Sequence, residues 1–305
     1  MRLMADSYIF HPARRLGFFL HLTSIGLLLL AGGVGLWQAS RAEAGLPFLV
    51  FLSLPLAAGV GLPVLVYRLY ALWSASYILE RNGIRLRWGM RVEEIPADQV
   101  EWVRLDRRMP QPLPRLAFAW PGAVVGLRPW HDGRLLEYMA DRSADLVLVA
   151  TAQRVFAISP SDSGDFMLTY QRLTEFGSLE PIPARSVYPG FLFSRFRTDQ
   201  PARLLLLASG LLDVVLFVVV AAGVTTRQQV ALRFTAQGVP GDYVPAVRLF
   251  LLPVLNTLFL LADSFVGLFF YRRPELQPLS YLVWGASLVT AGLFLGAAVF
   301  ILSYG

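Results

Sequence analysis

The sequence predicts a membrane α-helical protein with about five spanning helices and one all-β domain inserted after the second of them. Of its 305 residues, 55% are hydrophobic and only 16% are charged, and the mean hydropathy is +0.54. The apolar residues gather in nearly uncharged runs of about 20 residues, the length at which a helix crosses a hydrocarbon core ~30 Å thick. A long segment between the second and third runs is instead polar and rich in strand signals. This pattern excludes a single soluble enzyme domain.

The apolar runs are the expected spanning helices. They lie at Leu16–Trp37, Leu46–Tyr67, Leu204–Val224, Leu249–Tyr271 and Tyr281–Leu302. The residues behind the first run, Arg41 to Gly45, resemble a signal-peptidase site, so cleavage of that run is an alternative. We expect an uncleaved helix, because a signal peptide has an apolar core of about 7–15 residues and this run is longer.

Arginines at the ends of the runs predict the orientation of the chain, since basic residues resist translocation. Most of them share one side of the membrane if the N-terminus is cytoplasmic. That side carries Arg2, Arg14, Arg15, Arg68, Arg81, Arg195, Arg197, Arg203, Arg272 and Arg273. The opposite side carries the smaller set Arg41, Arg227, Arg233 and Arg248. We therefore expect the N-terminus and the polar segment inside and the C-terminus outside.

The polar segment has the pattern of short strands joined by tight turns. Asn82-Gly83 is the strongest signal for a two-residue hairpin turn, and Gly83–Trp88 alternates between apolar and basic residues, as a strand with one buried face does. Further strands are expected at 74–80, 91–95, 100–105, 123–127, 135–140, 146–150 and 154–158. An amphipathic helix is expected from Ser159 to Gly177. Antiparallel strands capped by this one C-terminal helix would make a small split barrel.

Three stretches of this segment carry a family resemblance. They are Tyr77–Leu86 with Gly89 and Ile95-Pro96, then Trp120–Gly122, and finally Val155–Pro160 followed by Asp165-Phe166. Together they resemble the pleckstrin-homology (PH) fold of bacterial PH-like domains attached to membrane helices. In those families such stretches form the first hairpin, a strand entry in mid-domain, and the last strand before the helix. The resemblance implies a domain for self-association and protein contacts more than for lipid headgroups.

The C-terminal half carries a looser pattern, formed by Leu232–Asp242, Leu252-Pro253 and Asn256. It resembles small bacterial membrane proteins related to the sporulation-delaying-protein immunity family, in which a His-Phe-Asn stretch and Gly-x-Pro-Asp precede a helix with Pro and Asn. Arg233 stands here in place of the His, and Thr235 in place of the Asn. These departures argue against a ligand or metal role for the loop.

We expect four regions along the chain. They are two spanning helices within 1–73, a PH-like domain at 74–177, a juxtamembrane linker rich in Pro, Arg and aromatic residues at 178–203, and three spanning helices within 204–305 with an extracytoplasmic loop at 225–247. The expected location is the bacterial inner membrane, with the PH-like domain on its cytoplasmic face.

No catalytic or metal centre is predicted. The chain has no Cys, and its three His lie far apart in the sequence, without the spacing of a metal site. It has no glycine-rich phosphate loop, no His-Glu-x-x-His helix and no Gly-x-Ser-x-Gly elbow. Cytoplasmic arginine explains the net charge of +6 better than a nucleic-acid site, because no motif for one is present. We expect no cofactor, no nucleic-acid partner and no enzyme activity.

Four polar residues inside the expected spans form a candidate intramembrane site. They are His21, Asp213, Asn256 and Asp263. Ionisable groups in a bilayer cost about 2.5–3.5 kcal/mol on insertion scales and therefore need an explanation. One hypothesis is a proton or cation relay shared by neighbouring helices. The hypothesis we favour is that these groups hold the helices together by hydrogen bonds worth ~1 kcal/mol each.

Arginines of the polar segment suggest a surface that faces the membrane. Arg104, Arg107 and Arg108 form the better cluster, because acidic residues lie close to the alternative set on the first hairpin. That alternative set is Arg85, Arg87 and Arg91. Each arginine near an anionic leaflet contributes about 1 kcal/mol of attraction.

The sequence as a whole predicts a non-catalytic module that membrane helices hold at the bilayer for interaction or assembly. Its expected partners are the lipid bilayer and either a protein partner or a second copy, contacted through the PH-like domain. The alternative is a small transporter or membrane signal sensor that uses Asp213 and Asp263.

Overall fold

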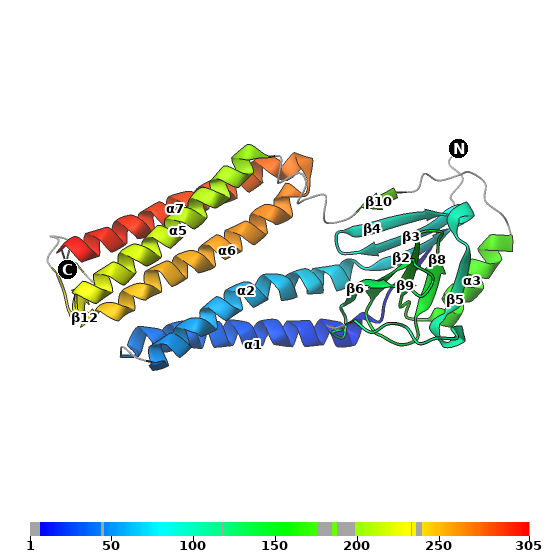
Figure 1. Ribbon diagram of the computed structural model, residues 1–305, viewed down its shortest axis with the longest axis horizontal. Helices are drawn as coiled ribbons and strands as arrows, with labels where there is room; N and C mark the ends of the chain where they lie inside the picture. The colour runs from blue at the N-terminus through cyan, green and yellow to red at the C-terminus, as the bar shows by residue number, and fades with distance from the viewer. Residues whose placement is uncertain are drawn as a thin grey trace. The chain divides into compact units, whose positions relative to one another are not determined.

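The computed structural model divides the chain into two compact units (Figure 1). The first unit consists of Met1–Ser24 and Leu65–Pro189, and the second of Ile25–Val64 and Gly190–Gly305. The structure describes residues 7–43, 46–116, 119–175, 185–187, 199–232, 234–235 and 240–304. Most of the expected linker at 178–203 therefore lies outside the described residues, and so does Arg233 of the expected outer loop.

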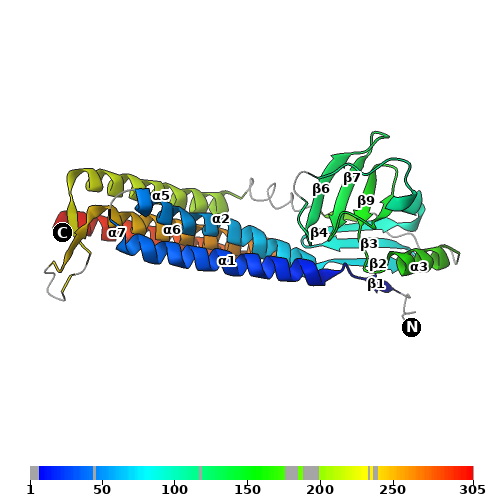
Figure 2. The same ribbon diagram turned by 90° about the horizontal axis from the view of Figure 1, so that it is seen from below.

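The first unit contains two five-stranded sheets. The first sheet has the order β1-β2-β3-β4-β10, with β1 at Tyr8–Phe10, β2 at Ser76–Glu80, β3 at Gly83–Trp88, β4 at Arg91–Pro96 and β10 at Arg185–Val187. The second has the order β5-β8-β9-β7-β6, with β5 at Trp102–Leu105, β6 at Val124–Pro129, β7 at Leu135–Ala140, β8 at Val147–Ala150 and β9 at Arg154–Ile158 (Figure 2). The expected strands and the Asn82-Gly83 hairpin turn are confirmed.

Two strands of the first sheet were not predicted. β1 pairs with β2, and β10 pairs with β4, both antiparallel. Each has only three residues, which is too short to show an alternating pattern. These strands bring the chain before the first long helix, and a segment well beyond residue 177, into the β-rich unit.

One strand pair contradicts the expectation of an entirely antiparallel domain, because β7 and β9 run parallel. β9 lies between β8 and β7, and its residues Val155–Ile158 are completely buried. Strands covered on both faces have such continuous apolar runs. One side of β9 pairs with β8 of its own hairpin. The other side pairs with β7 of the earlier β6–β7 hairpin, and β7 runs parallel to β9.

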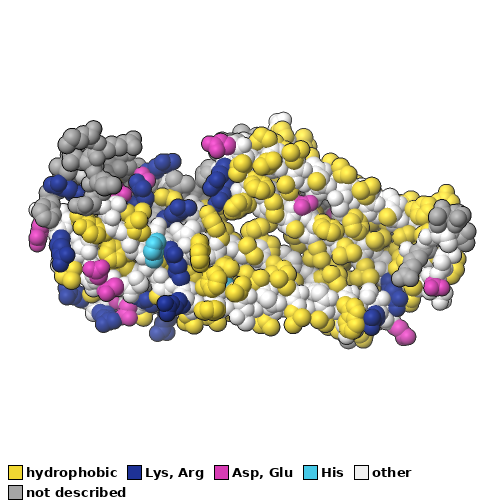
Figure 3. All heavy atoms as spheres, turned by 180° about the vertical axis from the view of Figure 1, so that it is seen from behind, with side chains coloured by type: hydrophobic (Ala, Val, Ile, Leu, Met, Phe, Trp, Pro, Cys, Tyr) yellow, Lys and Arg dark blue, Asp and Glu magenta, His cyan; other side chains and the backbone are white. Residues whose placement is uncertain are grey.

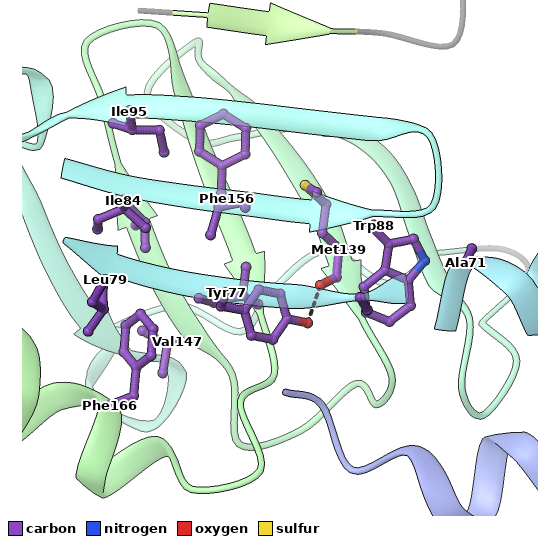
Figure 4. Packing of buried hydrophobic residues seen from close by; sticks show 14 of the residues in the cluster. Ala71, Tyr77, Leu79, Ile84, Trp88, Ile95, Met139, Val147, Phe156 and Phe166 are labelled. Atoms are coloured by element: carbon purple, nitrogen blue, oxygen red, sulfur yellow. Dashed lines mark hydrogen bonds between the residues drawn. The ribbon is translucent and has the colours of Figure 1, made fainter. Parts of the chain in front are cut away.

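The main core lies between the two sheets (Figure 4). Tyr77 of the first sheet and Met139 and Phe156 of the second are buried in it, and the Tyr77 hydroxyl donates to the Met139 carbonyl oxygen at 2.7 Å. Helix α3 (Ser163–Glu175) contributes Phe166 to the same cluster. The helix is therefore part of the core packing of this unit.

A second apolar cluster covers the other face of the second sheet. Trp130, Leu136 and Tyr138 belong to it, and partly buried side chains of the proline-rich segment 109–116 pack against it. The Tyr138 hydroxyl donates to the carbonyl oxygen of Pro114 at 2.7 Å. The second sheet is thus buried on both faces.

Five helices are long and apolar enough to cross a membrane in the described part of the chain, and together they indicate a multi-pass membrane protein. They are α1 (Arg14–Arg41), α2 (Leu46–Ser74), α5 (Gln200–Thr226), α6 (Leu251–Tyr271) and α7 (Gln277–Tyr304). Hydrophobic side chains cover the helices, whereas most charged side chains lie over the β-rich unit (Figure 3). α1, α2, α5 and α7 each contain one of the apolar runs expected from the sequence. The run Leu249–Tyr271 begins in the 3-10 helix Ala246–Phe250 and continues through α6.

In the second unit, α7 packs against both α5 and α6. A short hairpin of β11 (Gln229–Ala231) and β12 (Tyr243–Pro245) lies between α5 and α6 in the sequence. It falls within the region that we expected to be the loop 225–247.

Candidate functional site

Two of the four predicted intramembrane residues meet in the second unit. Asp213 of α5 accepts hydrogen bonds from Asn256 Nδ2 and Thr257 Oγ1 of α6, both at 2.8 Å. Asp213 is 7% exposed and Asn256 2%, so both groups are removed from surroundings that could solvate them. Thr257 was not predicted, although it directly follows Asn256. The carboxylate is satisfied by donors from a neighbouring helix.

The other two predicted residues have separate partners. Asp263 of α6 accepts a hydrogen bond from the Ser287 hydroxyl of α7. His21 belongs to the first unit, where its Nδ1 lies 2.6 Å from the carbonyl oxygen of Gly17 on its own helix. These contacts hold each group in a local hydrogen bond, and a relay through them stays a prediction.

A polar cluster at the start of α5 was missed by the sequence analysis. Asp199 caps α5 by accepting from the Ala202 amide at 3.2 Å, and it also accepts from Tyr271 at 2.7 Å, Tyr281 at 2.6 Å and Gln277 at 3.2 Å. One carboxylate thereby connects α5, α6 and the start of α7. The signal for the cap was present, because Asp followed by Gln-Pro is a typical helix start.

The hydrogen bonds of Asp199 predict acid sensitivity of the second unit. Burial acts to raise the pKa of Asp199, but the bonds from Tyr281, Tyr271, the Ala202 amide and Gln277 outweigh it and hold the pKa below its ordinary value. An acid with a lowered folded-state pKa stabilises the fold above its unfolded pKa of about 3.9 and loses that contribution as the pH falls through the folded value.

We expect the thermal midpoint of the full chain in detergent to decrease when the pH is lowered below about 4. Asp199→Asn should remove part of this decrease and should also lower the midpoint at pH 7. Glu275→Gln, which changes an exposed acid of the same unit, is the matched control. Identical pH profiles for wild type and Asp199→Asn would contradict the prediction.

A buried charge cluster joins the two sheets of the first unit. Arg91 of β4 forms a two-pronged ion pair with Glu137 of β7, at 2.8 and 3.1 Å, and a second pair with Glu93 at 2.7 Å. Arg154 lies 3.4 Å from Glu137, and Arg91 donates to Ser186 Oγ of β10 at 3.1 Å. Arg91 belongs to the less favoured set of candidate membrane-facing arginines, because acidic residues lie close to it in the sequence. The structure excludes Arg91 from such a surface, since it is 6% exposed and paired with acids.

The arginines predicted to face a membrane are exposed but do not form one uniform cluster. Arg104 of β5 lies over the ring of Trp102, 5.0 Å from its centroid, and Arg107 is paired with Asp145. Arg108 follows on the same short turn of 3-10 helix. β5 and β6 are the two opposite edges of the second sheet. A membrane-facing role for these arginines stays a prediction.

Two of the hollows on the described part of the first unit adjoin each other. One of about 420 Å³ lies between the proline-rich segment and the second sheet, and another of about 390 Å³ lies between the start of α1 and the segments before β6 and after β7. They have Ala119, Val124 and Ser143 in common. Among the described residues, no group of three or more His, Asp or Glu side chains could hold a metal ion.

This arrangement, a two-sheet β domain combined with apolar helices, defines the class of a membrane-associated protein with a β-rich domain. Within that class, a family model described as Bacterial PH domain matches residues 75–174. The β-rich unit therefore contains a PH-like domain, as the sequence predicted. The match ends at residue 174 and covers none of the segment Leu232–Asn256, and the resemblance to the immunity family is not shown. No curated protein matches the chain. The solved structures also include no match.

Proposed function

We propose that this chain is a non-catalytic protein of the bacterial inner membrane that presents its PH-like domain on the cytoplasmic face as an interaction or assembly module. The observation that carries the proposal is the way the domain is attached. β1 directly precedes α1, β2 directly follows α2, and the two strands pair with each other. The hairpin of α1 and α2 is therefore attached at both of its ends to one pair of hydrogen-bonded strands.

Close backbone packing strengthens this attachment at two further points. A Cβ atom added to Gly17 of α1 would lie 2.5 Å from Cα of Gly122, just before β6. A Cβ on Gly89, in the β3–β4 turn, would lie 2.9 Å from the Cβ of Ala71 near the end of α2. Contacts this close leave little room for the domain to rock on these helix ends, which suits a module that must present one face to a partner.

The alternative function, a transporter or sensor built on Asp213 and Asp263, has less support. Both carboxylates accept hydrogen bonds from neighbouring helices, which is the arrangement expected of groups that hold a bundle together. Proton-driven uptake by the reconstituted full chain that Asp213→Asn and Asp263→Asn abolish would favour the transporter instead.

A photo-crosslinking experiment tests the module. The face of the first sheet that points away from the core carries the exposed residues Ile9 and Arg87. We expect a photoreactive amino acid at Arg87 of the full chain, in its native membrane, to give a discrete protein adduct, either with a second copy or with one other protein.

The same probe at the exposed Leu168 of α3 is the control. We expect Ile9→Asp to reduce the adduct at Arg87 at least about tenfold, as the loss of one well-packed apolar contact does. The absence of any protein adduct at Arg87 would overturn the proposal.

A further inference from the structure

The hollow of about 390 Å³ lies against the first turn of α1. Ala13, Leu16 and Gly17 form one wall, and the segments Trp120–Gly122 and Asp141–Ser143 form the others. The close approach of the Gly17 and Gly122 backbones holds these walls together. α1 is apolar enough to cross a membrane from Arg14 onward, and a helix that crosses a bilayer would place its first turn near the lipid headgroups.

One positively charged side chain lines the hollow, and hydrogen bonds to the backbone fix its position. The guanidinium of Arg142 donates from Nε to the carbonyl oxygen of Ala144 at 3.2 Å and from Nη2 to that of Pro160 at 2.9 Å. It makes no salt bridge within the described part of the chain. Backbone carbonyls orient a guanidinium without neutralising its charge, so an anion in the hollow would find a fixed donor.

One acid also lines the hollow and must be weighed against this charge. Asp141 is 7% exposed, its amide donates to Ser159 Oγ, and its Oδ1 has no hydrogen-bond partner among the described residues. Burial raises the pKa of Asp141, although a Ser159 hydrogen bond and the charge of Arg142 act in the opposite direction. The charge of Arg142 acts on this carboxyl and so offsets the repulsion that it would exert on an anion.

Apolar side chains surround the hollow on the side of the membrane helices. Leu16 is 65% exposed and Trp120 42% exposed, and both line the hollow. Trp73, at the end of α2, is 65% exposed and contacts Phe18 of α1. Tryptophan concentrates at the membrane–water interface, where its ring meets both headgroups and acyl chains.

From this geometry we infer that the hollow is a binding site for one membrane phospholipid, with its phosphate at Arg142 and its glycerol region against Leu16 and Trp120. Of the arginines predicted to face a membrane, Arg107 lines the adjoining hollow of about 420 Å³, whereas none of the three is among the described residues that line this one. A bound lipid would fill the space between α1 and the PH-like domain and so tie the domain to the bilayer itself.

Native mass spectrometry of the detergent-purified full chain tests this site with added phosphatidylglycerol as the probe. We expect one tightly held lipid, bound at least about tenfold more weakly by Arg142→Gln, since a charge-assisted hydrogen bond is lost. Arg172→Gln, which changes an exposed arginine of α3 in the same unit, should leave binding unchanged. Ala13→Phe should also remove the lipid, because it fills the hollow without deleting a hydrogen bond of the protein.

Two further probes separate a lipid from a free anion. Diacylglycerol, which lacks the phosphate, should not bind, and inorganic phosphate at millimolar concentration should not displace the lipid. Equal lipid retention by Arg142→Gln and Arg172→Gln, retention by Ala13→Phe, binding of diacylglycerol, or displacement by phosphate would each overturn the inference. Thermal unfolding of every variant shows whether it is folded. If Arg142→Gln is not folded, lipid binding by Ala13→Phe tests the inference.

Discussion

Glu137→Ala will destabilise the PH-like domain by about 3–5 kcal/mol, because it leaves a buried arginine without its main counter-charge. Arg91 and Glu137 are 6% exposed each, and both guanidinium–carboxylate bonds of the pair would be lost. The remaining acid, Glu93, contacts Arg91 through Nη2 and compensates only in part. Hydrogen exchange of the full chain in detergent measures the effect, as faster exchange of β4, β7 and β9.

The matched control is Arg85→Ala, which breaks the ion pair between Arg85 of β3 and Glu94 of β4. The Arg85 side chain is 42% exposed, so its loss should cost at most about 1 kcal/mol. The double variant Arg91→Met with Glu137→Leu should recover most of the stability, since apolar replacements remove both charges together. Similar losses for Glu137→Ala and Arg85→Ala would contradict the argument.

Gly122→Ala will loosen the PH-like domain from the first helix, at a cost of about 2–5 kcal/mol. Gly122 has a φ of 83°, which an L-residue adopts only with strain. The added Cβ would also lie 2.5 Å from Cα of Gly17, where neither backbone can move aside easily. We expect a lower thermal midpoint and faster hydrogen exchange in the first turn of α1.

Gly133→Ala separates the two causes of this effect. Gly133 has a φ of 85°, but nothing lies within 4 Å of the position of a Cβ atom there. It therefore carries the backbone strain alone, about 1–2 kcal/mol, and should leave exchange in α1 unchanged. Equal effects of the two substitutions on α1 would mean that the Gly17–Gly122 contact does not hold the domain.

Local patterns were sufficient to predict the spanning helices and the hairpins. The apolar runs appear as α1, α2, α5, α6 and α7, and Asn82-Gly83 joins β2 to β3. These elements depend on the hydrophobicity of neighbouring residues, on a two-residue or 3.6-residue period, and on turn chemistry. All of that information is contained in short windows of the sequence.

The candidate sites were predictable only in part. Asp213 and Asn256 could be found because a polar residue in an apolar run needs a partner, and the structure brings them together. The cluster around Asp199 and the hollow at Arg142 could not be found, because each is assembled from separate elements whose polar residues are ordinary in their own segments.

The sequence by itself determined the class of this protein: apolar helices, a PH-like domain between the second and third of them, and the strands of that domain. Only the tertiary structure decided that β9 runs parallel to β7, that β1 and β10 complete the first sheet, and that Arg91 is buried. Two partners of Arg91, Glu137 and Ser186, are 46 and 95 residues away in the chain. Strand order and buried charge pairs depend on which distant segments share one core. The hydrophobic periodicity of a short stretch of sequence does not contain that information.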